Sequence, residues 1–169
     1  MIVDYCHNVP GMIMLGDFVD KTGAALETTN DLGRISRIGV IATAGDRRND
    51  DMRELGGEAA RHFDVLIVRE DSNLRARAPG EVADMVVGGA RQAMADGARC
   101  KQVEIVLDEL ASVRHALSRS NPGDLVVICV EQHAAVMAYL ESYGHHAQPG
   151  ARPADDREFS NAVPDPDSH

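Results

Sequence analysis

The stretch Asp64-Val65-Leu66-Ile67-Val68 decides the fold of this chain. Four consecutive apolar residues with a charged residue on either side are typical of a parallel strand that is buried on both faces. A helical pattern precedes the stretch, with Met52, Leu55 and Ala59 on one face, and another helical pattern follows from Pro79. The segment therefore predicts a buried strand that is connected to a helix on each side.

The same alternation extends along the chain in both directions. Further strand-like runs occupy residues 2–4, 37–42, 103–107 and 125–130, and further helical patterns begin near Pro10, Asn49, Leu110 and Ala134. A strand followed by a helix, repeated about five times, predicts the α/β class. We expect a three-layer, Rossmann-like sandwich with a mostly parallel sheet of about five or six strands.

Polar and turn-forming residues set the expected element boundaries. The polar segment 20–34 predicts a helix end and a loop, and Gly144 predicts the end of the last helix. The amide of Asn49 and the carboxylates of Asp50 and Asp51 are expected to cap the second helix, where backbone N–H groups are free.

The composition indicates one folded domain followed by a tail. Residues 1–144 form the expected domain, and apolar residues make up 44% of the chain, which is enough for a core. Residues 145–169 hold four of the seven prolines and few apolar residues. This acidic, proline-rich segment is expected to be disordered.

The charge balance excludes several classes of partner. A net charge of −10 repels phosphate backbones and anionic lipids, so we expect neither nucleic-acid nor membrane binding. No apolar run is long enough to span a bilayer, and no secretory signal is visible. The three cysteines form no CxxC pair, which favours a reducing, cytoplasmic location.

Open parallel sheets bind ligands at the carboxyl ends of their strands, and three loops there carry patterned polar residues. The first loop contains Asp4, His7 and Asn8. A carboxylate can hold ribose hydroxyls or a magnesium-bound water, and an imidazole can donate to a phosphate oxygen. The alternative is a capped strand–helix turn with an incidental histidine.

The second and third loops are more strongly charged. Residues 45–48, Gly-Asp-Arg-Arg, allow close backbone approach and bidentate binding of a carboxylate or phosphate. Alternatively, these arginines pair with the nearby Asp50 and Asp51. Residues 69–77 carry dense mixed charge, which suits recognition of an amino acid, and a solvated loop with internal ion pairs is the alternative.

Several motifs are absent from the sequence. It has no GxxxxGK[ST] P-loop, no GxGxxG after a strand and no GxSxG nucleophile elbow. The histidines show no metal-ligand spacing, so we expect no metal site in this chain.

Taken together, these motifs resemble one family. Residues 3–8, VDYCHN, resemble the "VDYAHN" opening of the C-terminal domain of the Mur ligases, and residues 45–48 resemble that domain's "GDRR" motif. Residues 69–81 resemble the cyanophycin synthetase branch, with an acidic pair followed by "LRGRxxGE". Asp108 and Glu109 resemble the start of a later family helix. Ala76 departs from this pattern, because it replaces the glycine of "LRGR".

The resemblance implies an ATP-dependent carboxylate–amine ligase of which this chain is the C-terminal domain. In such enzymes a central P-loop domain binds ATP and Mg²⁺, a substrate carboxylate is phosphorylated, and an amine attacks the acyl phosphate. The C-terminal domain closes over the nucleotide and helps to hold the incoming amino acid, which is arginine in cyanophycin synthetases. The implied partners are the central domain, in cis or in trans, and an amino-acid or peptide substrate.

The resemblance also implies two groups of binding residues. Those on the ATP side are Asp4, His7, Asn8, Asp46 and Arg47. Those on the side of the incoming amino acid are Glu70, Asp71, Arg75 and Arg77, with the acidic pair facing its guanidinium. No catalytic residue is expected in this chain alone, because the P-loop lies on another domain.

Two other functions remain open at this point. One is a non-catalytic module that binds a nucleotide or an amino acid, and the other is a truncated remnant without activity. Because the sequence has no P-loop, we expect no ATP-dependent ligation by the chain alone.

Overall fold

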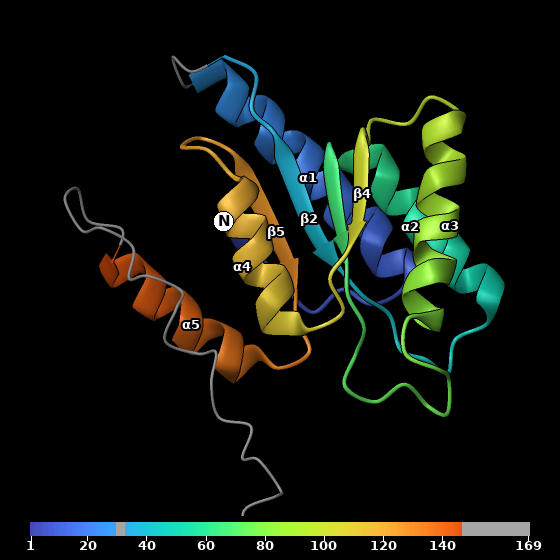
Figure 1. The fold of residues 1–169 in the computed structure, drawn as a ribbon. Helices are drawn as coiled ribbons and strands as arrows, with labels where there is room; N and C mark the ends of the chain where they lie inside the picture. The colour runs from blue at the N-terminus through green and yellow to red at the C-terminus, as the bar shows by residue number, and fades with distance from the viewer. Residues whose placement is uncertain (30–32, 147–169) are drawn as a thin grey trace, which may run out of the picture.

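A computed structural model describes residues 1–29 and 33–146 of the chain (Figure 1). Strands and helices alternate strictly along these residues. They are β1 (Ile2–Asp4), α1 (Val9–Thr29), β2 (Arg37–Ile41), α2 (Asn49–His62), β3 (Val65–Val68), α3 (Glu81–Ala95), β4 (Gln102–Ile105), α4 (Glu109–Arg119), β5 (Leu125–Cys129) and α5 (His133–His146).

The five strands form one parallel sheet with the order β1-β5-β2-β3-β4. The buried stretch that predicted the fold is β3, and its Ile67 lies opposite Val40 of β2. β2 and β5 are buried along their whole length, as expected for the centre of a sheet. The predicted three-layer α/β sandwich with a parallel sheet is confirmed.

Helices cover both faces of the sheet, in layers that Figure 1 shows on either side of the strands. One core contains Met12 of α1, Leu55 of α2 and Val86 of α3, so these three helices share one face. The other core contains Val113 of α4 and Val136 of α5. The helix after β5 therefore lies on the face opposite to the helices that follow β1 and β2.

Glycines bring α2 and α3 into close contact. A Cβ atom on Gly56 would lie 1.9 Å from the carbonyl oxygen of Val86, and one on Gly89 would lie 1.8 Å from that of Arg53. Both distances are shorter than a carbon and an oxygen can approach. The two helix backbones therefore pack directly against each other, and this fixes the positions of the loops that precede both helices.

The first helix is longer than the sequence predicts, since α1 continues through the polar segment to Thr29. Gly23, which suggested a turn, lies over the buried Arg37, where a Cβ would come within 2.4 Å of the guanidinium Nε. The hydroxyls of Thr28 and Thr29 donate to carbonyl oxygens one turn earlier in the helix. α1 thus ends inside the segment 20–34, where a helix end and a loop were expected, but it includes more of this segment than the turn-forming residues indicated, because tertiary packing requires the glycine.

Two further boundaries differ from the prediction. Arg48 occupies the N-cap position of α2, and no side chain caps this helix. The side chain of Asn49 instead accepts a hydrogen bond from Arg77 at 2.8 Å. α5 continues past Gly144 to His146. The tail predicted to be disordered lies outside the described residues from 147 onward.

Candidate functional site

All five strands run in the same direction, so the loops that follow them gather at one edge of the sheet, the lower edge in Figure 1. β5 is the last strand in the chain but lies between β1 and β2. The chain therefore leaves β5 toward one face of the sheet and leaves β1 and β2 toward the other. Crevices at such points are where open α/β sheets bind ligands.

The first loop is ordered by its own side chains. The Asp4 carboxylate accepts from the Cys6 amide at 2.7 Å. The Asn8 side-chain oxygen accepts from the Gly11 amide at 2.9 Å and so caps α1. The Thr43 hydroxyl donates to the His7 carbonyl at 2.9 Å, which ties this loop to the second one.

His7 is exposed, and one contact determines which of its ring nitrogens carries a hydrogen. Its Nδ1 lies 2.8 Å from the carbonyl oxygen of Tyr5, which can only accept, so Nδ1 carries a hydrogen. In the neutral ring Nε2 is then an acceptor. His7 can therefore donate to a phosphate oxygen from Nε2 only when the ring is doubly protonated and positively charged.

A cleft of about 440 Å³ separates the first and second loops, and we call it the α1–α2 cleft. Its lining includes two of the predicted nucleotide-side residues, Asn8 and Arg47, together with Thr43, Asp51 and Glu54. Asp4 and Asp46 do not line this cleft. Arg48 pairs with Asp51 at 2.8 Å, as the alternative reading of this loop expected.

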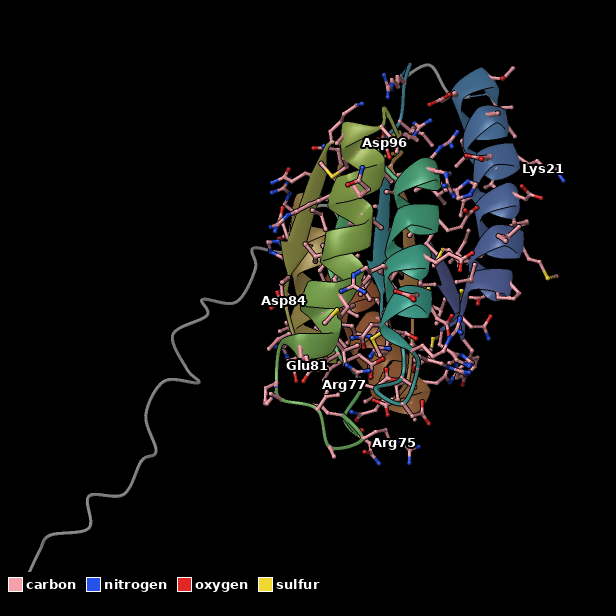
Figure 2. All side chains as sticks on the ribbon, turned by 90° about the vertical axis from the view of Figure 1, so that its right-hand side faces the viewer. Lys21, Arg75, Arg77, Glu81, Asp84 and Asp96 are labelled. Carbon is pink, nitrogen blue, oxygen red and sulfur yellow. The ribbon has the colours of Figure 1, made fainter. Side chains whose placement is uncertain are left out.

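Arg77 connects the third loop to the second. Its guanidinium donates to the carbonyl oxygens of Gly45 at 2.7 Å and Arg47 at 3.1 Å, and also to the Asn49 side chain. It pairs with Glu81 at 2.6 Å, and both residues lie at the same end of α3 in Figure 2. Arg77, predicted to bind substrate, is therefore held by contacts within the chain.

Glu70 is likewise engaged inside the protein. Its carboxylate oxygens accept from the backbone amides of Gly80 at 2.9 Å and Ala83 at 3.0 Å, and the residue is only 7% exposed. Glu70 thus caps the start of α3, although it lies ten residues before Gly80 in the chain. The geometry directs both oxygens of Glu70 to the helix, so a guanidinium would have to be bound by other carboxylates.

Arg75 lies apart from the other predicted residues, at the tip of the third loop (Figure 2). Its φ angle is 51° and that of Ala76 is 68°, so two consecutive non-glycine residues are left-handed. The Asn73 side chain accepts from the Arg75 amide at 3.0 Å and stabilises this turn. The tight turn exposes the Arg75 side chain to solvent.

The most buried charge at this edge is Arg69, which was not among the predicted site residues. Its guanidinium is 2% exposed and donates to the Cys129 carbonyl at 2.9 Å. It also pairs with Asp71 at 3.0 Å and with Glu109 at 3.2 Å. Arg69 therefore joins the loops that follow β3, β4 and β5.

Glu109 completes this connection from the start of α4. Its carboxylate oxygens accept from the backbone amides of Glu131 at 2.6 Å and Gln132 at 2.9 Å. The Glu131 carboxylate in turn accepts from the amide of Ser72 at 2.7 Å and from its hydroxyl at 3.0 Å. We call Arg69, Asp71, Ser72, Glu109 and Glu131 the strand-end network. Glu131 was not among the predicted site residues, and only its position after a buried strand could have indicated it.

Two small clefts border the strand-end network, and both are lined by Asp71 and Glu131. The Cys6 cleft, of about 290 Å³, is also lined by Cys6, His7 and Arg69. The acidic cleft, of about 280 Å³, has a lining that includes the further acidic residues Glu70, Asp108 and Glu109. His7 from the first loop and Asp71 from the third therefore meet at one cleft.

The charge of Asp71 is only partly compensated. Burial raises the pKa of its carboxyl group, and the carboxylates of Glu131 and Glu109 raise it further against the opposing effect of Arg69. A nearby cation would stabilise the charged form of this carboxylate. The acidic cleft is therefore suited to a positively charged ligand group.

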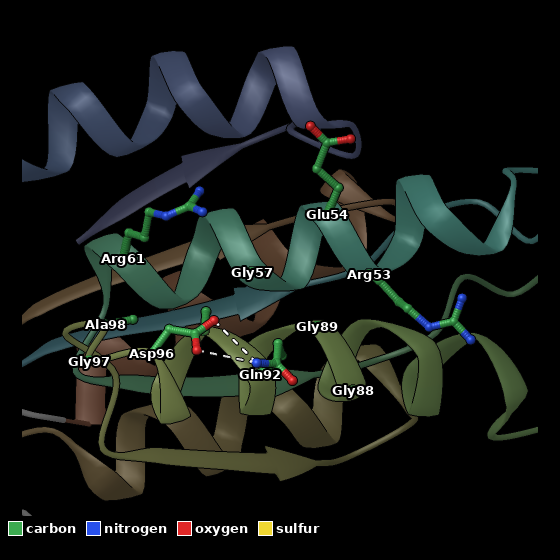
Figure 3. Close-up of a pocket in the computed structure, with 11 residues that line it drawn as sticks. Arg53, Glu54, Gly57, Arg61, Gly88, Gly89, Gln92, Asp96, Gly97 and Ala98 are labelled. Atoms are coloured by element: carbon green, nitrogen blue, oxygen red, sulfur yellow. Dashed lines mark hydrogen bonds between the residues drawn. The ribbon is translucent and has the colours of Figure 1, made fainter.

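A larger hollow lies elsewhere, in a groove of about 750 Å³ between α2 and α3 (Figure 3). Gly57, Gly88 and Gly89 line it, so it exists because side chains are absent. Gln92 and Asp96 bond to each other along its rim. None of the predicted site residues lines this groove.

No group of three or more His, Cys, Asp or Glu residues within 1–29 and 33–146 is placed to hold a metal ion. Over the same part of the chain, no helix is both long and apolar enough to cross a bilayer.

Comparison with known proteins gives one consistent family. A family model described as "Mur ligase, glutamate ligase domain" matches residues 1–130. The cyanophycin synthetase of Synechocystis sp. is 38% identical over 141 residues, which cover 83% of this chain and 14% of that protein. The cyanophycin synthetase of Crocosphaera subtropica is 38% identical over 132 residues, covering 77% of this chain and 13% of that protein.

More distant similarity extends to ligases with a different name. The UDP-N-acetylmuramoyl-L-alanyl-D-glutamate–2,6-diaminopimelate ligase of Syntrophomonas wolfei is 29% identical over 133 residues, covering 79% of this chain and 24% of that protein. A solved structure of a ligase with this name superposes with a TM-score of 0.57 at 16% identity, over 85% of this chain and 29% of that one. This superposition supports the fold, and the chain spans about one seventh of the length of the cyanophycin synthetases. The match over residues 1–130, together with 38% identity to cyanophycin synthetases, shows that the chain belongs to the Mur ligase family and represents its glutamate ligase domain.

Proposed function

We propose that this domain works within an ATP-dependent carboxylate–amine ligase, where it receives the incoming amino acid, and that this amino acid is arginine. The acidic cleft carries the proposal. Asp71 and Glu131 face a space bordered by further carboxylates, and Arg69 is the one cation joined to the strand-end network among the described residues. A guanidinium is planar and can bind two carboxylates at once.

The residues of the strand-end network divide into two roles in this proposal. Asp71 and Glu131 bind the guanidinium, because each lines both clefts. Arg69 and Glu109 are positioning residues, because they hold the loops that carry the binding carboxylates. Glu70 acts through the backbone by capping α3, and Arg75 and Arg77 keep the third loop in shape.

The first and second loops fit the border of a nucleotide site. Arg47 and Asn8 offer donors at the α1–α2 cleft, but Asp51 and Glu54 line the same cleft and repel phosphate. ATP, when bound, supplies the phosphoryl group that activates the substrate carboxylate. We expect its phosphates and Mg²⁺ to be held mainly by a P-loop domain, against which His7 and Arg47 close.

The guanidinium proposal is tested by NMR titration of the 169-residue chain with arginine and with citrulline. Citrulline has nearly the same shape but no charge on its side-chain end. We expect arginine to shift the backbone amide signals of Ser72 and Glu131, which line the cleft, and citrulline to leave them unchanged. Equal shifts from both ligands, or none from arginine, would refute the proposal.

Two variants refine this titration. Glu131→Gln removes one carboxylate of the cleft and should weaken arginine binding about tenfold, in line with the loss of one charge-assisted hydrogen bond. Glu141→Gln, on α5 and away from the cleft, makes the same chemical change and should leave binding unaltered.

The ligase proposal has its own test. The chain alone should not hydrolyse ATP, whereas addition of a P-loop domain from a cyanophycin synthetase lacking its own C-terminal domain should restore arginine-dependent ATP turnover when a peptide that carries the acceptor carboxylate is present. ATP hydrolysis by the chain alone would contradict this assignment of roles. Arginine binding without restored turnover would favour a non-catalytic binding module.

A further inference from the structure

Two cysteines meet where β1 and β5 end. Cys129 is the last residue of β5 and lies opposite Asp4 in the β1–β5 register. The Val130 amide donates to the Asp4 carbonyl at 2.8 Å, and the Asp4 carboxylate accepts from the Cys6 amide at 2.7 Å. One aspartate thus holds the turn that contains Cys6 against the strand end that contains Cys129.

Both thiols are enclosed in the same core cluster, but to different degrees. Cys6 is 9% exposed and lines the Cys6 cleft, whereas Cys129 is 1% exposed and does not line it. Gly11 gives the Cys6 sulfur room, since a Cβ there would lie 3.3 Å from it. A small reagent in the cleft can therefore reach Cys6 first.

The two thiols influence each other's pKa and become chemically different. A hydrogen bond from the Cys129 thiol lowers the pKa of Cys6, and the same contact together with burial raises the pKa of Cys129 well above its usual range. The thiolate is the reactive form of cysteine. Cys6 therefore forms a thiolate more readily than Cys129 does, and it is the member of the pair that lines the cleft.

We propose that Cys6 and Cys129 form a redox-active pair that a small hydroperoxide converts to an intrachain disulfide. The Cys6 sulfur attacks a peroxide oxygen, and the O–O bond breaks. One water molecule is released, and Cys6 becomes a sulfenic acid. The Cys129 sulfur then attacks the Cys6 sulfur, and the sulfenic oxygen leaves as a second water with the thiol proton. Two thiols lose two electrons to one hydrogen peroxide, which becomes two waters.

The disulfide would fasten the first loop to β5. Asp4, His7 and Asn8 belong to this loop, which is now ordered by hydrogen bonds and by the packing of Cys6 in the core. The pair does not depend on the proposed ligase function, because it follows from the packing of β1 against β5.

The test counts free thiols in the full chain before and after treatment with dilute hydrogen peroxide. The protein is denatured, alkylated with iodoacetamide and digested with trypsin, which places the three cysteines on three different peptides. We expect three alkylated cysteines before treatment and only Cys100 afterwards, with the Cys6 and Cys129 peptides joined. Dithiothreitol should restore all three, and oxidation of exposed methionines does not affect this count.

Two variants provide matched controls. Cys100→Ser removes the third cysteine and should leave formation of the disulfide unchanged. Cys6→Ala should leave Cys129 fully alkylatable after treatment, because the enclosed thiol loses its reactive neighbour. Retention of all three thiols, a disulfide between two chains, or Cys6 converted to sulfinic acid while Cys129 stays free would overturn the proposal.

Discussion

The guanidinium of Arg69 lies 3.2 Å from the carboxylate of Glu109, and the two side chains are 2% and 6% exposed. Neither group can exchange this partner for water. Each also holds backbone groups in place, Arg69 at the end of β5 and Glu109 in the turn that follows. The strand-end network therefore depends on one enclosed ion pair.

Removal of one partner of this pair should be costly. Arg69→Ala leaves the Glu109 carboxylate buried without its countercharge, and we expect a loss of about 3–5 kcal/mol in the free energy of unfolding. Urea denaturation followed by circular dichroism measures this loss. The control is Arg48→Ala, which breaks the exposed Arg48–Asp51 pair and should have no measurable effect. Equal effects of both variants would contradict the buried-pair interpretation.

Ala76→Gly should stabilise the protein by about 0.5–1 kcal/mol. Alanine is strained at the left-handed φ of 68°, whereas glycine adopts this conformation freely. Gly80→Ala is the reverse change in the same loop, at a φ of 89° with no atoms near the added Cβ, and should destabilise by about 1–2 kcal/mol. The melting temperature should rise for Ala76→Gly and fall for Gly80→Ala. A shift of both in the same direction would show that the φ angle does not determine the change in stability.

Adjacent glycines of α3 should respond oppositely to alanine. Gly89→Ala forces a methyl group into the Arg53 carbonyl and should cost about 1–3 kcal/mol or more, because α2 and α3 must separate. Gly88→Ala meets no atom within 4 Å and should gain about 0.5–1 kcal/mol from helix propensity. Urea denaturation of the two variants tests the direct backbone contact between α2 and α3. A neutral Gly89→Ala would rule out that contact.

Asp71→Asn should raise the melting temperature at neutral pH. Because folding raises the pKa of this carboxyl, the folded state binds more protons than the unfolded state between the ordinary and the raised pKa. The free energy of unfolding of the parent chain therefore falls as the pH rises from the ordinary to the raised pKa of Asp71. The asparagine variant has no carboxyl group at this position and does not lose this stability. Melting curves should converge below the ordinary aspartate pKa. A variant that is less stable than the parent at neutral pH would contradict the prediction.

The alternation of apolar runs and helical patterns was sufficient to predict the class and the parallel sheet, since burial on both faces leaves a continuous apolar run such as residues 65–68. The extent of α1 could not be predicted in this way. Gly23 indicates a turn by its local preference, but its role is to make room for Arg37, which is distant in sequence.

The candidate site was only partly visible in the sequence for the same reason. The motifs lie in loops that gather at one edge of the sheet, but they did not distinguish side chains that face a cleft from those that hold the loops. Glu70 caps a helix and Arg77 joins two loops, although both belong to the quoted motif. Arg69 and Glu109 were missed because their partners lie far away along the chain.

The position of β5 between β1 and β2 has a consequence for the order of folding. Val127 lies opposite Ile2 on one side and Gly39 on the other, so β1 has no strand partner in the sheet until β5 has been synthesised. β2, β3 and β4 can pair earlier, since each follows its neighbour after a single helix. Contacts between distant segments form late, because closing a long loop costs entropy. The strand that comes first in this domain is therefore among the last to reach its native place.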